Sequence, residues 1–120
     1  MNLNLDKVPS NLEEAVALLT DALDDKEKMV IKRLSVTKLH MSVGQYIRNE
    51  WSLWDKENVL TQWFKKNYDV DHADDVSSII IECVVADLIG RPRQDKELAK
   101  EFIEHWEAHK KKINKKNKES

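Results

Sequence analysis

Turn-forming residues are scarce in this chain, which has two glycines and two prolines among its 120 residues. Folds made only of β-strands need many tight turns, and glycine and proline form a large share of them. Apolar residues amount to 41% of the chain, which is enough for one hydrophobic core at this length. We therefore expect an all-α fold, a single compact domain of five to six short helices.

Cysteine and long apolar runs are scarce as well. Cys83 is the only cysteine, so no disulfide can form within the chain. It lies in the apolar run 79–85 with no cation or histidine beside it in sequence to activate the thiol, and we expect it in the core. Residues 1–6 have neither a basic region nor a long apolar stretch. We thus expect no signal peptide, no membrane-spanning segment and a cytoplasmic protein.

Charge is distributed unevenly along the chain. Six of the 20 basic residues fall within residues 110–120, and residues 1–109 hold 14 basic and 21 acidic residues, a net charge of −7. We expect a helical domain over residues 1–109 and a solvated, frayed, Lys-rich tail over residues 110–120. An acidic body repels phosphate backbones, so any contact with nucleic acid is left to the tail.

Capping patterns divide the chain into helices. A capping box at residues 10–13 and acidic residues at 24–25 predict the first two helices, and Asp55 is the expected cap of a helix over residues 56–67. Gly90 is expected to end the fifth helix. The predicted helices span residues 11–23, 24–33 and 56–67. A third helix starts within residues 35–38 and ends at 51, a fifth starts within residues 71–74 and ends at 89, and the last begins at 95.

Apolar spacing predicts which face of each helix is buried. Gly44 interrupts the third helix, and its cost of about 1 kcal/mol relative to alanine indicates a close approach by another helix. The fifth helix is apolar nearly all round, so we expect it to be central. The inward residues predicted for the other helices are Leu12, Val16, Leu19 and Leu23; Met29, Val30 and Leu34; Leu39, Val43, Tyr46, Ile47 and Trp51; Val59, Leu60, Trp63 and Phe64; and Leu98, Phe102, Ile103 and Trp106.

Residues 44–54 combine two tryptophans with an arginine and an asparagine, which is unusual for a solvated helix. Core packing accounts for Trp51, and Asn49 is expected to cap the end of the helix. Trp54 falls at a helix junction, where it either packs in the core or stays half-exposed and anchors an interface. The candidates for contact with a partner are Arg48, Asn49, Trp51, Trp54 and Asp55.

A second group of polar residues is expected to meet where the third and fifth helices pack together. One interpretation is structural, with Arg48 paired to Asp74 or Asp75. The other is an enzyme or metal site built on His40, Arg48, His72 and Asp75, although their spacing matches no established zinc or di-iron pattern. We predict a structural cluster, with no metal and no cofactor. Its members are His40, Arg48, His72, Asp74, Asp75 and Ser77.

Two blocks of this sequence resemble a family of small bacterial and phage domains of unknown function. The first block has His40 and Gly44, then Ile-Arg-Asn at residues 47–49 and Trp-Ser-Leu-Trp at residues 51–54; the second runs from His72 through two acids to Ser-Ser-Ile-Ile at residues 77–80. The resemblance covers residues 8–105 and implies a helical fold and no particular activity. The family's second histidine and its proline are absent here, where Met41 and Ala73 stand.

These observations favour a small acidic protein-binding module over an enzyme. We expect a protein partner, and an inhibitor or adaptor that acts on a host protein is one form such a module takes in a phage or mobile element. The alternatives are the enzyme or metal site on the His40 group and nucleic-acid binding through the Lys-rich tail.

Overall fold

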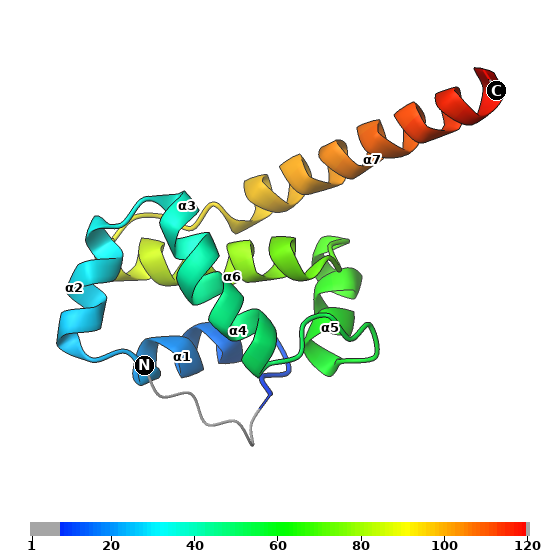
Figure 1. Ribbon diagram of the computed structural model, residues 1–120. Helices are drawn as coiled ribbons and strands as arrows, with labels where there is room; N and C mark the ends of the chain where they lie inside the picture. Colours follow the sequence, from blue (N-terminus) through cyan, green and yellow to red (C-terminus); the bar gives the residue numbers. More distant parts are fainter. Residues whose placement is uncertain (1–7, 120) are drawn as a thin grey trace.

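The computed structural model describes residues 8–119, with side chains over residues 8–113. All regular structure in that range is helical, so the predicted all-α fold is confirmed (Figure 1). The third predicted helix is one continuous segment with three parts, which gives six helices in all. The elements are α1 (Leu12–Ala22), α2 (Asp25–Arg33), α3 (Val36–Leu39), η1 (His40–Gly44), α4 (Gln45–Glu50), α5 (Val59–Tyr68), α6 (Ala73–Ile89) and α7 (Asp95–Glu119).

Helix α6 lies at the centre of the fold, as its composition predicted. It packs against α1, α2, η1, α4, α5 and α7. Asp74 and Asp75 occupy its first turn, where the helix dipole favours acidic side chains, and Gly90 ends it in the left-handed conformation with φ 75°. Its ten buried residues are Ala73, Asp75, Val76, Ser77, Ile79, Ile80, Ile81, Cys83, Val84 and Ala86.

The third predicted helix crosses α6 closely at Gly44. A Cβ atom on Gly44 would lie 2.9 Å from Arg48 Nη1 and 3.3 Å from Ile81 Cδ1, so only glycine leaves room for both side chains. The predicted close approach is confirmed. One feature was not predicted: residues His40–Gly44 form a π-helical turn, η1, of the kind that often occurs at functional sites.

Two predicted helix starts need correction. The cap of α1 is Asn11, whose side chain accepts from the backbone N–H of Glu14 at 2.9 Å, one residue later than the box predicted at Ser10. The cap of α5 is Asn58, not Asp55. Asn58 accepts from Leu60 N–H at 2.8 Å, and its amide group donates to the Trp51 carbonyl at 2.6 Å.

Asp55 was a wrong prediction because residues 51–58 form turns before α5 begins. Its carboxylate accepts from the backbone N–H of Glu57 at 2.9 Å and so closes one of those turns. By contrast, the start of α2 is confirmed, with Asp24 and Glu27 in a reciprocal capping box. A polar residue followed by apolar ones marks a start region well, but the exact cap depends on the path of the preceding chain.

The buried faces of most helices follow the predicted spacing, with exceptions in α2 and α5. Met29 and Val30 are each 54% exposed, and Ile31 is the core residue of α2 instead. Val59, the first residue of α5, is 52% exposed. The apolar residues predicted to face inward from α7 are half-buried against the rest of the core.

Helix α7 crosses the expected boundary between residues 109 and 110 without a break and continues to Glu119. Its C-terminal half extends away from the other helices (Figure 1), and the side chains of Lys110, Lys111 and Lys112 are exposed. Within the described residues, none of the helices has the length and apolarity needed to cross a membrane.

Removing the observed cap of α5 should destabilise the protein more than removing the expected one. For Asn58→Ala we expect the free energy of unfolding to fall by about 1–2 kcal/mol, because a cap and a buried carbonyl lose their partners. Asp55→Ala is the matched control and should cost less than about 0.5 kcal/mol. Urea denaturation of both variants measures the difference, and an equal loss would refute the assignment of Asn58.

Candidate functional site

Arg48 is the buried centre of the polar cluster, with 7% of its surface exposed. Its Nη1 donates to Ser77 Oγ at 2.9 Å, and its Nη2 donates to the His40 carbonyl at 3.4 Å. Its Nε lies 3.3 Å from Asp74 Oδ1 but makes no hydrogen bond within the described residues, so this contact is an ion pair only. The predicted pairing of Arg48 with an acid of α6 is confirmed, and the acid is Asp74.

His40 and Ser78 lie next to this cluster in an arrangement that does not suit nucleophilic catalysis. His40 Nδ1 is 3.0 Å from Ser78 Oγ, and the same hydroxyl donates its only proton to the Asp74 carbonyl at 2.8 Å. His40 Nδ1 must then be the donor of the first contact. A serine activated by histidine donates its proton to the ring instead.

His72 and Asp75 do not join the Arg48 cluster. The ring of His72 stacks on Trp106 with centroids 3.8 Å apart, and the Asp75 carboxylate accepts from Trp106 Nε1 at 2.8 Å. The single predicted cluster is therefore two groups, because successive residues of α6 point to different neighbours. One group holds η1 and α4 to α6, and the other holds α7 to α6.

Neither group resembles a metal centre or a thiol site. Among residues 8–113 no three His, Cys, Asp or Glu side chains gather closely enough to hold a metal ion. Cys83 is fully buried, and burial raises the pKa of its thiol to about 12. This thiol is therefore protonated at neutral pH and is not a nucleophile.

The predicted partner contacts divide between the core and the surface. Trp51 is 1% exposed and Arg48 is buried, so both lie inside the fold. Trp54 is 59% exposed, and its Nε1 donates to the side chain of Asn49 at 3.5 Å, so Asn49 is not the predicted backbone cap. Asn49, Trp54 and Asp55 together form an exposed corner between α4 and α5.

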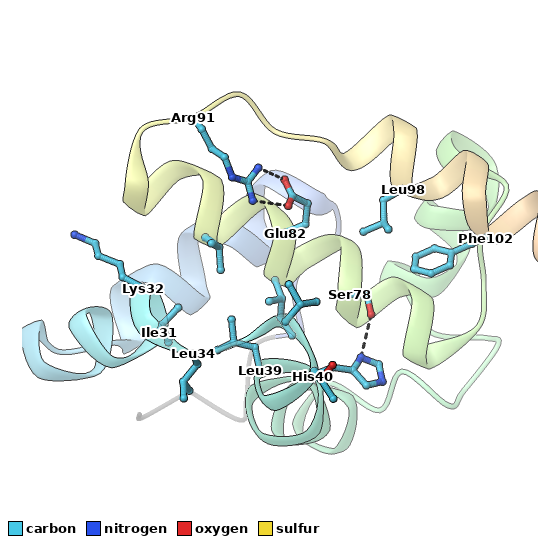
Figure 2. A pocket seen from close by; sticks show the side chains of 14 residues that line it. Ile31, Lys32, Leu34, Leu39, His40, Ser78, Glu82, Arg91, Leu98 and Phe102 are labelled. Carbon is cyan, nitrogen blue, oxygen red and sulfur yellow. Dashed lines mark hydrogen bonds and ion pairs between the residues drawn. The ribbon is translucent and has the colours of Figure 1, made fainter.

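A larger feature is an apolar groove of about 470 Å³ that the sequence did not predict (Figure 2). Helices α2 and α3 with η1 form one wall, α6 forms the floor, and the start of α7 closes one end, while Lys32 lies at the opposite end (Figure 2). The lining residues are Ile31, Lys32, Leu34, Val36, Thr37, Leu39, His40, Ser78, Ile81, Glu82, Val85, Arg91, Leu98 and Phe102.

Two polar pairs border this apolar groove. His40 and Ser78 lie on one side, and Glu82 and Arg91 on the other (Figure 2). Arg91 donates to both carboxylate oxygens of Glu82, at 2.8 and 2.7 Å, and Glu82 also accepts from the backbone N–H of Gln94. The hydrogen bonds from Arg91 lower the pKa of Glu82, so this carboxylate is ionised and its charge is balanced.

The edge of the apolar groove leaves apolar side chains exposed. Val36 is 80% exposed and Leu34 is half-buried. A second hollow of about 280 Å³ adjoins the groove, since Ile31 and Leu34 line both. One feature of the sequence could have indicated this exposed apolar edge. Val36 directly follows the cap of a helix and is not among the residues predicted to face inward, so it was an apolar residue with no predicted place in the core.

The model of one protein family, described as Domain of unknown function (DUF6794), matches residues 8–88 of the chain. No curated protein and no solved structure matches it. The matched span runs from just before α1 to the last turn of α6, so it includes all of the groove lining except the residues from Arg91 onward. This match confirms the predicted resemblance to a family of domains of unknown function.

Arg48→Met should reveal whether the buried cluster is structural. We expect a loss of about 2–4 kcal/mol in the free energy of unfolding, because the His40 carbonyl and Ser77 lose a donor and Asp74 loses its ion pair. Arg33→Met, which changes an exposed arginine, is the control and should cost less than about 0.5 kcal/mol. Equal small losses in urea denaturation would contradict the structural role.

The Glu82–Arg91 pair should make stability depend on pH in one direction. Because its pKa in the folded protein lies below the ordinary value of 4.5, Glu82 contributes stability above pH 4.5 that is lost as the pH falls through the lowered pKa. Glu82→Gln should therefore be less stable than wild type by about 1 kcal/mol at pH 7, and this gap should close at acidic pH. Urea denaturation at several pH values tests this, and a gap independent of pH would contradict it.

Proposed function

The chain belongs to the DUF6794 family, and for this member we propose the function of a protein-binding module that takes an apolar segment of its partner into the apolar groove. The observation that carries the proposal is the groove itself, with about 470 Å³ of space lined mainly by aliphatic side chains. Binding energy at protein interfaces is concentrated in such pockets, where an apolar anchor is fully desolvated. Val36 at its edge adds contact area that now faces water.

The shape of this surface supports a polypeptide rather than a compact molecule as the ligand. Ile31 and Leu34 line both the apolar groove and the adjoining hollow, so apolar surface is available on either side of these residues. A helix or an extended segment can place successive side chains along it. Two pairs of hydrogen-bonding groups at its borders, His40 with Ser78 and Glu82 with Arg91, already have partners within the protein.

The exposed corner of Asn49, Trp54 and Asp55 is a second candidate surface for the same function. Its main support is the 59% exposure of Trp54. Tryptophan is among the residues most enriched at binding hot spots, but it acts there when a partner covers it fully. An inhibitor or adaptor that acts on a host protein, in a phage or mobile element, is a form of this function that either surface would serve.

The enzyme alternative has less support than binding. It would need His40, Arg48, His72 and Asp75 around one substrate, whereas His72 and Asp75 contact Trp106 and Arg48 contacts Ser77. The proton of Ser78 is also directed to a backbone carbonyl. A binding role requires no such convergence, which is why we prefer it.

Val36→Asp should abolish partner capture. The charge would lie at the edge of the apolar groove, where a partner would have to desolvate it, and we expect at least a tenfold loss of captured partner. Val59→Asp is the matched control, because Val59 is also an exposed valine at the first position of a helix. Affinity capture from a lysate of the native cell, quantified by mass spectrometry, compares the two variants and Trp54→Ala.

The three variants separate the two surfaces. If only Val36→Asp reduces the amount of captured partner, the apolar groove is the binding surface. If only Trp54→Ala reduces it, the binding surface is the exposed corner. Equal capture by wild type and all three variants would refute both surfaces.

A further inference from the structure

The wall of the apolar groove that α2 and α3 form is basic, in contrast to the rest of the body. Residues 26–38 contain five basic residues and one acidic residue, whereas residues 1–109 as a whole carry a net charge of −7. The five cations are exposed or half-buried. They are Lys26, Lys28, Lys32, Arg33 and Lys38. A patch of one sign on a body of the opposite sign selects its partners by charge.

The positive charge at the groove has no balancing acid. Lys32 lines the apolar groove and is exposed, and it makes no ion pair with any described residue. Arg91 is the other cation in the lining, and it neutralises Glu82, the only acid there. The end of the groove at Lys32 therefore has an unopposed positive charge next to apolar surface.

We propose that the occupant of the apolar groove is an acidic amphipathic helix of a partner protein. Its apolar face would enter between α2–α3 and α7, with residues at i, i+3, i+4 and i+7 on Leu34, Val36 and Phe102. A Glu or Asp at the border of that face would lie against Lys32. This inference rests on the proposed function and names the chemistry of its partner.

The charge of the body strengthens this choice. The α2–α3 wall is opposite in sign to the net charge of −7 of residues 1–109, so it attracts an acidic helix more than the body does on average. An anionic membrane would meet the same basic residues. A flat bilayer could contact these exposed cations but could not fill the recessed apolar lining of the groove.

The test uses a display library of amphipathic helices of about five turns, with a constant leucine face and Glu, Gln or Lys at random in the flanking positions. The full chain is the bait. We expect selected peptides to be enriched in Glu, and the best one, labelled with a fluorophore, to lose about 5- to 10-fold in affinity for Lys32→Glu. Lys66→Glu changes an exposed lysine on α5 and is the matched control, with less than a twofold loss expected.

Val36→Asp and Val59→Asp are measured with the same peptide. The inference is supported if the selected peptides are enriched in Glu and if their affinity falls for both Lys32→Glu and Val36→Asp. Peptides that require Val36 but show no preference for Glu would overturn the acidic partner and leave the proposed function intact. If no peptide is selected, or if Val36→Asp and Val59→Asp bind equally, a helical occupant of the groove is refuted, and the capture experiment with the native lysate decides separately whether the proposed function stands. Vesicles of anionic lipid that bind wild type but not Lys32→Glu would overturn the inference in favour of a membrane.

Discussion

The close crossing of the His40–Glu50 segment over α6 is the contact on which the rest of the structure depends. Gly44 allows the approach, and Arg48 fills the space beside it while donating to Ser77 of α6 and to the His40 carbonyl. A buried guanidinium costs several kcal/mol unless its charge and its donors are satisfied, and Asp74 supplies the opposite charge. The crossing places Leu39 and His40 against α6, and these residues form part of the groove wall.

The apolar groove exists because α7 is held away from the opposite wall. Tyr68 donates to Asp95 at the start of α7, and Trp106 donates to Asp75 further along. Burial, with this hydrogen bond, raises the pKa of Tyr68, so the phenol stays a donor at neutral pH. Between these two anchors, Leu98 and Phe102 contact only part of the floor that α6 provides. Arg91 and Glu82 hold the chain that joins α6 to α7, and within residues 8–119 no element covers the groove floor that α6 provides.

Local patterns in the sequence predicted the elements, and contacts between distant residues decided the site. The capping box at Asp24, the glycine stop at Gly90 and the central helix were predictable because each depends on a few neighbouring residues. Asp55 and Asn58 could not be ranked as caps, because the choice depends on the hydrogen bond from Asn58 to the Trp51 carbonyl. The split of the polar cluster was equally hidden, since it follows from the position of Trp106, 31 residues from Asp75.

The charge of the body as a whole and the charge at the apolar groove have opposite signs. An acidic body suggests a partner with a basic surface. At the scale of one groove the sign is reversed, because Lys32 lines it without an ion pair to any described residue, while Glu82 is neutralised by Arg91. Interactions between exposed charges fall off over about 8–10 Å in physiological salt, so a docked helix responds mainly to the residues at the groove. The net charge of −7 over residues 1–109 then acts only at longer range, and residues 110–120, with six lysines and one acid, carry the opposite sign.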